Sequence, residues 1–355
     1  MPNFRAPLSR RRALAVAGGV AGFVAAPHLG LSTMLPPALV TPRRPGVIRT
    51  ADSDPDSPGQ TDLPVDQMLQ ILPGEWNVDK SGILEIDFGR TDLEPITGSY
   101  MGQSIQFQPS FQIGTEFYFQ SLGNGQAVFN GDIACLPDEL NPLIDQLLAN
   151  SLVFQAEHQH FFNLNPMLFF IHERAVGDPI AIATALRNTL QNATKTPISG
   201  PPMQLQSSAS WVDVNMLESI LQGEADVSPS DGVVTVTIPR RNKIILGGVD
   251  IDPSLNVATT VAFEQINGSS ATVAASPDFS LVSSEVQRVM GVMRSQNPPW
   301  DVHCLYNQET DEHPQLFFSH QLKIGSDPYE LAREVRAGLD QTNSQGSPPQ
   351  PPSQH

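Results

Sequence analysis

Apolar and polar positions alternate in the same order twice along this chain. Each half begins with a short amphipathic segment that glycine ends, which predicts a helix. A strand with apolar residues at every second position follows, and then two strands joined by a glycine-containing turn. These elements are predicted at 65–74, 82–86, 116–120 and 127–130 in the first half, and at 214–223, 232–236, 260–264 and 271–274 in the second.

The remainder of each half predicts a helix, a pair of strands and a final helix. The middle helix follows a turn rich in acids or hydroxyls, which suits the positive end of a helix dipole. The strand pairs are predicted at 152–160 with 167–172, and at 302–308 with 315–320. Helices and antiparallel strands that follow one another in this way indicate an α+β fold.

The sequence around the last strand pair repeats almost literally. NPMLFFIH at 165–172 returns as HPQLFFSH at 313–320, and both are followed by a Gly, Asp and Pro segment that opens a helix. A period this long indicates two tandem diverged copies of one domain, each with antiparallel strands and about three helices. We place repeat 1 at 62–192, a linker at 193–210 and a degenerate repeat 2 at 211–342. The two sheets could pair about a pseudo-two-fold axis, or the copies could be independent beads on a linker.

The chain ends have compositions unlike the repeats. SRRRALA at 9–15 and a short apolar run to Ala26 predict a twin-arginine-type export signal within 1–40. The run is shorter than the ~20 apolar residues that span a bilayer, so we expect no integral membrane span in the mature chain. We therefore expect an exported protein in the periplasm, the cell envelope or the medium. Segments 41–61 and 343–355 have little to bury and predict a disordered linker and a disordered tail.

The net charge indicates which ligands to expect, and the sequence around the two cysteines indicates their redox state. The net charge of −17 repels phosphate backbones and anionic lipid heads, so nucleic acid is not an expected partner, whereas a small ligand or metal is compatible. Cys135 and Cys304 could form one disulfide in an oxidising compartment, but their apolar strand contexts favour buried free thiols.

The candidate chemistry is a histidine cluster in repeat 1. His158 and His160 are two residues apart on a predicted strand, so their side chains emerge on one face. A short hairpin returns His172 beside them, and diagonal cross-strand neighbours lie ~7–8 Å apart, within reach of one divalent ion such as zinc. Repeat 2 has Tyr306 and Gln308 at the matching positions. We therefore predict a metal site at His158, His160 and His172, with repeat 2 acting as a scaffold.

Other catalytic patterns are not found in the sequence. It contains no nucleophile elbow, P-loop or dinucleotide-binding motif. Glu139 is predicted to be a capping acid at a helix start. Asp132 could approach the histidines from the preceding strand, although a turn aspartate is the favoured interpretation.

The chain resembles a known family of bacterial exported proteins. The residues that carry the resemblance are ELNP at 139–142, HQH at 158–160, the segment 166–172 and the helix that follows Gly177 and Asp178. They are similar to the LppY/LpqO family, which is built from a domain of unknown function, often in two copies. The resemblance implies an envelope or secreted location and no established activity. Lipid attachment, which many members have, does not carry over because the leader lacks a cysteine.

Three functions remain open from the sequence. The first is an exported protein that binds a metal ion or small ligand at the His-x-His pair, and the second is a metal-assisted hydrolase that uses the same pair. The third is a structural envelope protein with a vestigial site. Because an exposed imidazole is protonated below ~6.5, metal binding is expected to weaken in mildly acidic buffer.

Overall fold

The computed structural model describes residues 59–269 and 271–349. The predicted export signal at 1–40 and the predicted linker up to residue 58 lie outside the described residues. The last residues of that linker are held in place, because the Gly59 N–H donates to the Val78 carbonyl at 2.9 Å.

Repeat 1 starts with helix α1 (Val65–Ile71), has α2 (Leu140–Ala149) in its middle and ends with α3 (Pro179–Ala193). Helix α3 begins where the sequence indicates, because the Asp178 side chain accepts a hydrogen bond from Ala181 N and Pro179 occupies the first position. The strands are β1 (Glu75–Val78), β2 (Leu84–Phe88), β3 (Thr97–Tyr100), β4 (Gln103–Gln106), β5 (Thr115–Gly123), β6 (Gln126–Cys135), β7 (Val153–His158) and β8 (Phe169–Gly177).

Repeat 2 has the same plan. Its helices are α4 (Val214–Leu221), α5 (Ser283–Ser295) and α6 (Pro328–Leu339), and Asp327 caps α6 as Asp178 caps α3. Its strands are β10 (Glu224–Val227), β11 (Val234–Ile238), β12 (Ile244–Leu246), β13 (Val249–Ile251), β14 (Thr259–Gln265), β15 (Val273–Val282), β16 (Asp301–Val302), β17 (Glu312–His313) and β18 (Leu316–Gly325).

Strand pairing confirms the duplication and the α+β fold. The order β1-β2-β5-β6-β8-β7 in the first sheet matches β10-β11-β14-β15-β18-β16 in the second, and β3-β4 matches β12-β13. The matching neighbours pair antiparallel in both sheets. The linker between the repeats adds a short strand, β9 (Met203–Gln204), that pairs parallel with β1.

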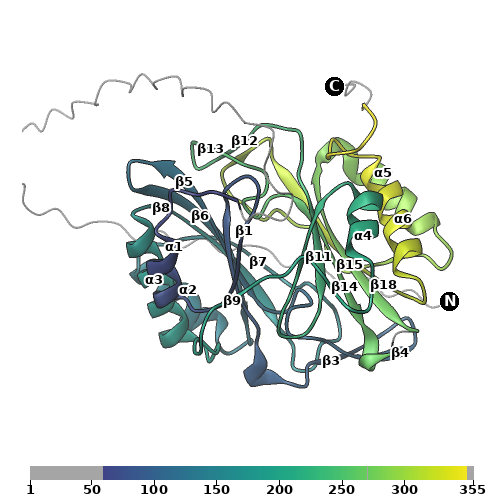
Figure 1. Cartoon of the computed structure of the whole chain (residues 1–355), viewed down its shortest axis with the longest axis horizontal. Coiled ribbons are helices and arrows are strands. Elements are labelled where there is room, and N and C mark those ends of the chain that lie inside the picture. The colour runs from purple at the N-terminus through teal and green to yellow at the C-terminus, as the bar shows by residue number, and fades with distance from the viewer. Residues whose placement is uncertain (1–58, 270, 350–355) are drawn as a thin grey trace, which may run out of the picture. The chain divides into compact units, whose positions relative to one another are not determined.

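The four layers run helices, sheet, sheet, helices (Figure 1). In β2, Leu84, Ile86 and Phe88 are buried in the cluster that contains residues of α1, α2 and α3, while the residues between them face the other way. Repeat 2 buries the equivalent face of β11 against α4, α5 and α6. The period of two along each strand therefore gives every sheet a helix-covered outer face and an inner face.

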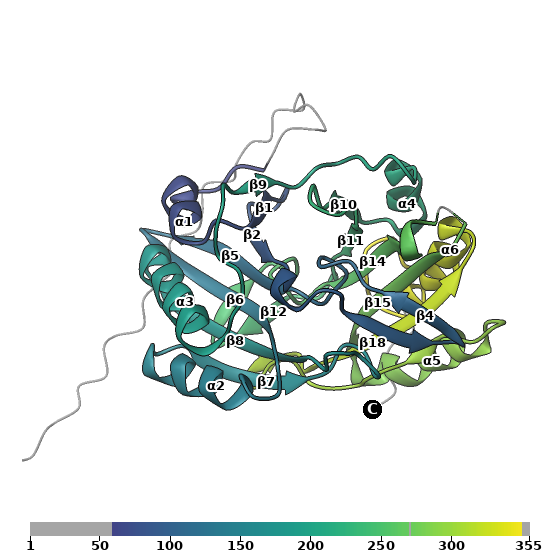
Figure 2. The same cartoon turned by 90° about the horizontal axis from the view of Figure 1, so that it is seen from below.

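The inner faces of the two sheets pack against each other (Figure 2). Two buried clusters mix residues of both repeats, so the interpretation as independent beads is wrong. The contacts come in equivalent pairs. The Gln120 side chain accepts from Asp252 N at 2.8 Å, and Glu264, which occupies the matching position, accepts from Gln108 N at 2.8 Å. The repeats are thus related by a pseudo-two-fold axis between the sheets.

A buried ion pair occurs at equivalent positions in both repeats, next to the start of the middle helix. The Arg90 guanidinium donates to Glu139 and to the Ala134 carbonyl, each at 2.9 Å. Glu139 also accepts from Leu136 N at 2.8 Å, so it acts as the predicted capping acid at the start of α2 and in addition forms the ion pair. Arg240 contacts Glu285 and the Ser280 carbonyl in the same way.

The chain that follows each repeat returns to this ion pair. Lys195 N donates to Glu139, and Asn343 N donates to Glu285 at 2.8 Å. The prediction of disorder for 343–355 is therefore wrong for 343–349, where Ser344 and Ser347 are buried. Composition suggested a tail, but the hydroxyls and backbone donors satisfy buried acceptors.

Cys135 and Cys304 are both free thiols in the structure. Burial raises the pKa of the Cys135 thiol to about 12, which leaves it protonated and unreactive. In the part of the chain that the structure describes, no helix has the length and apolar character to cross a bilayer.

The paired interface contacts predict a pH-dependent change in stability. Burial raises the pKa of Glu264 well above its ordinary value, whereas repeat 1 has the neutral Gln120 at the matching position. A carboxyl with a raised folded pKa costs stability as the pH rises above its unfolded value of ~4.5. Glu264→Gln should therefore stabilise the protein by about 1 kcal/mol or more at pH 8, and the gain should vanish towards pH 4.5. Thermal unfolding at several pH values measures it.

The matched control is Gln120→Glu, which places a carboxyl at the equivalent position, which is half-buried in repeat 1. It should destabilise the protein at pH 8 and have little effect at pH 4.5. A Glu264→Gln variant that is less stable than the wild type at pH 8 would contradict the burial cost.

Candidate functional site

The His-x-His pair lies on the inner face of the first sheet. His158 is the last residue of β7, where it pairs with Phe170 of β8. His160 follows two residues later, and the ring centroids of the two histidines are 4.7 Å apart. Both side chains are buried, at 8% and 5% exposure. They therefore face the second sheet and not solvent.

The third imidazole of the cluster comes from repeat 2. His320 of β18 stacks on His160 with ring centroids 3.9 Å apart. One ring nitrogen from each of His158, His160 and His320 lies within 4.8 Å of the other two. We call these three residues the histidine centre. It is formed by both repeats, so repeat 2 is more than a scaffold.

The pseudo-two-fold axis explains this composition. Tyr306 bridges Phe318 as His158 pairs with Phe170, so the two residues occupy equivalent positions. Their rings stack with centroids 3.7 Å apart, which puts them beside the axis. Rotation about the axis therefore carries the histidine centre onto a second half-site. That half-site consists of Tyr306, Gln308 and His172.

His172 thus belongs to the second half-site. Its Nδ1 lies 3.2 Å from the Gly131 carbonyl, and its Nε2 lies 3.3 Å from the Tyr306 hydroxyl. Although its ring is 5.0 Å from that of His158, both of its nitrogens already have hydrogen-bond partners. The structure therefore gives the third position beside His158 and His160 to His320, where the sequence predicted His172.

Comparison with repeat 2 fixes the tautomer of His160. Its Nδ1 lies 2.7 Å from the Gln112 carbonyl, and at the matching position the Gln308 amide donates to the Asn256 carbonyl at 2.5 Å. An amide Nε2 can only donate, so Nδ1 of His160 donates in the equivalent bond and Nε2 carries the lone pair. Within the described residues, that Nε2 and both nitrogens of His158 and His320 lack a hydrogen-bond partner. Buried polar atoms rarely remain unpaired.

Two carboxylates flank the histidine centre. Asp132 Oδ2 lies 3.2 Å from His160 Nε2, and Asp278 Oδ2 lies 3.4 Å from His320 Nε2. Asp132 pairs with His172 across the sheet as Asp278 pairs with His320. The favoured interpretation of Asp132 as a turn residue is therefore wrong, because it lies within β6. A carboxylate facing an imidazole lone pair requires a proton or a cation between them.

Burial sets the charge of this cluster. It lowers the pKa of His160 to about 4 and lowers the pKa of His158 and His320 well below the ordinary value. It also raises the pKa of Asp132 to about 6. At neutral pH the imidazoles are neutral, which is the form that binds metal. The sequence-based expectation that protons compete below ~6.5 assumed exposed imidazoles and does not apply to these buried ones.

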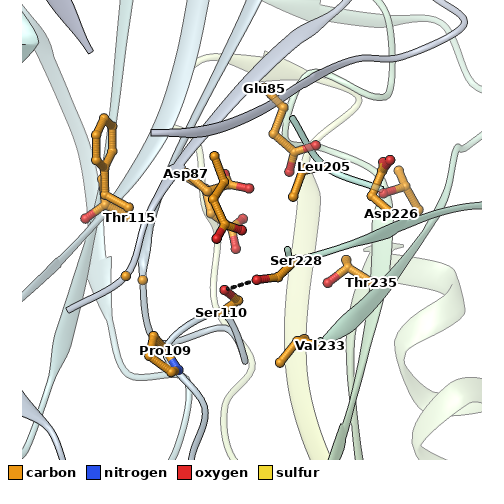
Figure 3. Close-up of a pocket in the computed structure, with 16 residues that line it drawn as sticks. Glu85, Asp87, Pro109, Ser110, Thr115, Leu205, Asp226, Ser228, Val233 and Thr235 are labelled. Carbon is orange, nitrogen blue, oxygen red and sulfur yellow. Dashed lines mark hydrogen bonds between the residues drawn. The ribbon is translucent and has the colours of Figure 1, made fainter. Parts of the chain in front are cut away.

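A second polar region lies between the sheets on the side of β1 and β10 (Figure 3). A cavity of about 50 Å³ is lined by carboxyl groups from both sheets, together with serine and threonine hydroxyls. The acids are Glu75, Glu85, Asp87, Glu116 and Asp226. This volume holds a few water molecules.

The sequence missed His320 and Asp278 as site residues because it assigned the chemistry to one hairpin. The usable signal was the alignment of the two copies, in which His172 falls on His320. His320 retains the imidazole of His172 although its own repeat has lost the His-x-His pair. A histidine that recurs without its local partners can have partners in the other copy.

The fold and site define a duplicated α+β protein with a buried histidine centre between its two copies. The chain belongs to the family described as Domain of Unknown Function (DUF1259), whose model matches residues 66–192 and again residues 215–341. These matches coincide with the two repeats. No curated protein and no solved structure matches the chain.

Proposed function

We propose that this protein binds one divalent metal ion, such as zinc, at His158, His160 and His320. The observation that supports the proposal most strongly is three buried, neutral imidazoles that each place one nitrogen within 4.8 Å of the other two. Of their six ring nitrogens, only His160 Nδ1 has a hydrogen-bond partner among the described residues. Ligand nitrogens around tetrahedral zinc lie about 3.4 Å apart, so small side-chain rotations would close the set. Three histidines leave a fourth position for water or a ligand.

The surroundings of the histidine centre also favour a cation. Asp132 and Asp278 each have one oxygen near a ring nitrogen and one oxygen without a partner in the described structure. A divalent ion would compensate both carboxylates and remove the repulsion between carboxylate and lone pair. Carboxylates that accept from or orient a metal-bound imidazole are common around zinc.

The location proposed for this binding protein is outside the cytoplasm. The arginine-rich segment at 9–15 supports export, and the resemblance to the LppY/LpqO family supports an envelope or secreted site. Within the wider family we assign the chain to that exported group.

The metal proposal predicts which histidines are needed. Elemental analysis of purified protein should find about one zinc per chain. His160→Gln and His320→Gln should remove it, and His160→Gln should remain folded because glutamine makes the Gln112 bond in the manner of Gln308. His172→Gln is the matched control and should retain the metal. Loss of zinc with His172→Gln but not with His320→Gln would restore the sequence-based triad and contradict this site.

Buried imidazoles predict a weak pH dependence of zinc affinity. Three ligands of ordinary pKa ~6.5 would lower the affinity about a thousandfold between neutral pH and pH 5.5. Because the pKa of His160 is about 4 and those of His158 and His320 are lowered, protons compete only in more acidic buffer. Chelator-competition titrations should give affinities within about tenfold at pH 7.5 and 5.5. A thousandfold loss would show that the imidazoles are solvated.

A metal-assisted hydrolase is the second candidate. It is favoured by Asp132, whose carboxyl lies beside His160 and whose pKa is raised to about 6, close to the range of a general base. The zinc-loaded protein should then hydrolyse p-nitrophenyl esters or phosphates, and Asp132→Asn should lower the rate at least a hundredfold while the metal content stays the same. Turnover no faster than that of free zinc would reject the enzyme.

A further inference from the structure

We infer that the half-buried carboxylates of the first sheet form the route by which a hydrated divalent cation reaches the histidine centre. This inference rests on the proposed metal function and adds how the ion enters. The route, which we call the acidic row, consists of Glu75, Asp87 and Glu116 and ends at Asp132.

Strand register places the acidic row in a line. Glu75 of β1 pairs with Asp87 of β2, Asp87 with Glu116 of β5, and Glu116 with Asp132 of β6. Directly paired residues project from the same face of a sheet, with neighbouring Cβ atoms about 5 Å apart. The row therefore crosses the inner face of the sheet from near its edge to the site.

The outer part of the row opens on the cavity between the sheets. Glu75, Asp87 and Glu116 line it, with Glu85 and Asp226 beside them (Figure 3). The described residues that line the cavity include no lysine, arginine or histidine. Burial, followed by the repulsion between neighbouring carboxyls, raises the pKa of Asp87 and Glu116, and a cation between these acids would relieve the repulsion and favour their ionised forms.

The inner end of the row meets the histidine centre. Asp132 is 5% exposed and its Oδ1 has no partner among the described residues, while its Oδ2 lies 3.2 Å from His160 Nε2. Glu116 pairs directly with Asp132 across the neighbouring strands, so the two carboxyl groups are adjacent on the inner face. An ion leaving Glu116 therefore reaches Asp132 next and a free imidazole lone pair after that.

Repeat 2 shows that the fold does not require these acids. Its equivalent row runs Glu224, Thr237, Thr260 and Asp278, with threonine in place of Asp87 and Glu116. Both acids are unfavourable for folding, because burial is the main cause that raises the pKa of each. Only the row that ends at the His-x-His pair carries them.

A larger cavity near the histidine centre is the competing entrance. Its volume is about 360 Å³, and its lining includes Tyr100, Phe162, His303 and Arg294. The His303 N–H donates to the His320 carbonyl at 2.9 Å, so one residue that lines this cavity is the backbone neighbour of the histidine centre. Its aromatic walls and the arginine are less suited to a hydrated cation than the acidic row.

The experiment measures the rate of loading with cobalt(II), followed by the visible absorption of the bound ion. The test variant is Asp87→Thr/Glu116→Thr, which installs the residues of repeat 2. The matched control is Asp145→Thr/Glu94→Thr, which removes two exposed acids and therefore the same number of acidic groups. The test variant should load at least tenfold more slowly at low salt, with unchanged final stoichiometry, and the control should load as the wild type does.

The possible results separate this inference from the metal proposal. A wild-type chain that binds no cobalt overturns the proposed function itself. A wild type that binds, with a test variant that loads equally fast, overturns only the acidic row and favours the entrance near His303. If the control variant loads as slowly as the test variant, the slowing is due to the overall charge of the protein. If the test variant binds less cobalt per chain while its thermal stability is unchanged, the two acids are part of the binding site. Either result also overturns the route.

Discussion

The packing of two sheets through their inner faces is the constraint on which the rest of this structure depends. Because the two copies meet around a pseudo-two-fold axis, inner-face residues beside the axis lie close to their equivalents in the other copy. His158 and Tyr306 show this most directly, since equivalent residues stack on each other. The helices cover the outer faces and bury most of the apolar surface. The inner faces are thereby free to carry polar chemistry, although burying it has a cost.

Hydrogen bonds that occur at equivalent positions in both repeats offset much of the cost of burying these polar groups. Gln120 and Glu264 hold equivalent backbone N–H groups across the axis, and His160 and Gln308 hold equivalent loop carbonyls. Among the described residues, five ring nitrogens of the histidine centre and one oxygen each of Asp132 and Asp278 remain without partners, as do buried atoms elsewhere, such as both carboxyl oxygens of Glu173. So many unpaired atoms in one cluster need a physical explanation, because buried polar atoms are rarely left unpaired.

Local pattern was sufficient for the elements and insufficient for the site. The helices, most strands and the duplication could be predicted because amphipathic period, glycine stops and the NPMLFFIH and HPQLFFSH segments are local signals. The short strands β1, β3, β4, β9, β10, β12, β13 and β17 were missed, as were the docked residues 343–349, because their order comes from tertiary partners. The histidine pair was found, but His320 and Asp278 come from the other copy. No periodicity states which faces of two domains meet.

The position of the histidine centre across the axis changes how its parts can vary. In a symmetric dimer of a single copy, every substitution would appear in both half-sites at once. In one continuous chain each half-site draws on different codons, so Tyr306 and Gln308 can alter one half-site while His158 and His160 stay as they are. The short linker with β9 therefore does more than join two domains. It allows the two half-sites to carry different residues, so that one keeps the His-x-His pair while the other packs against it.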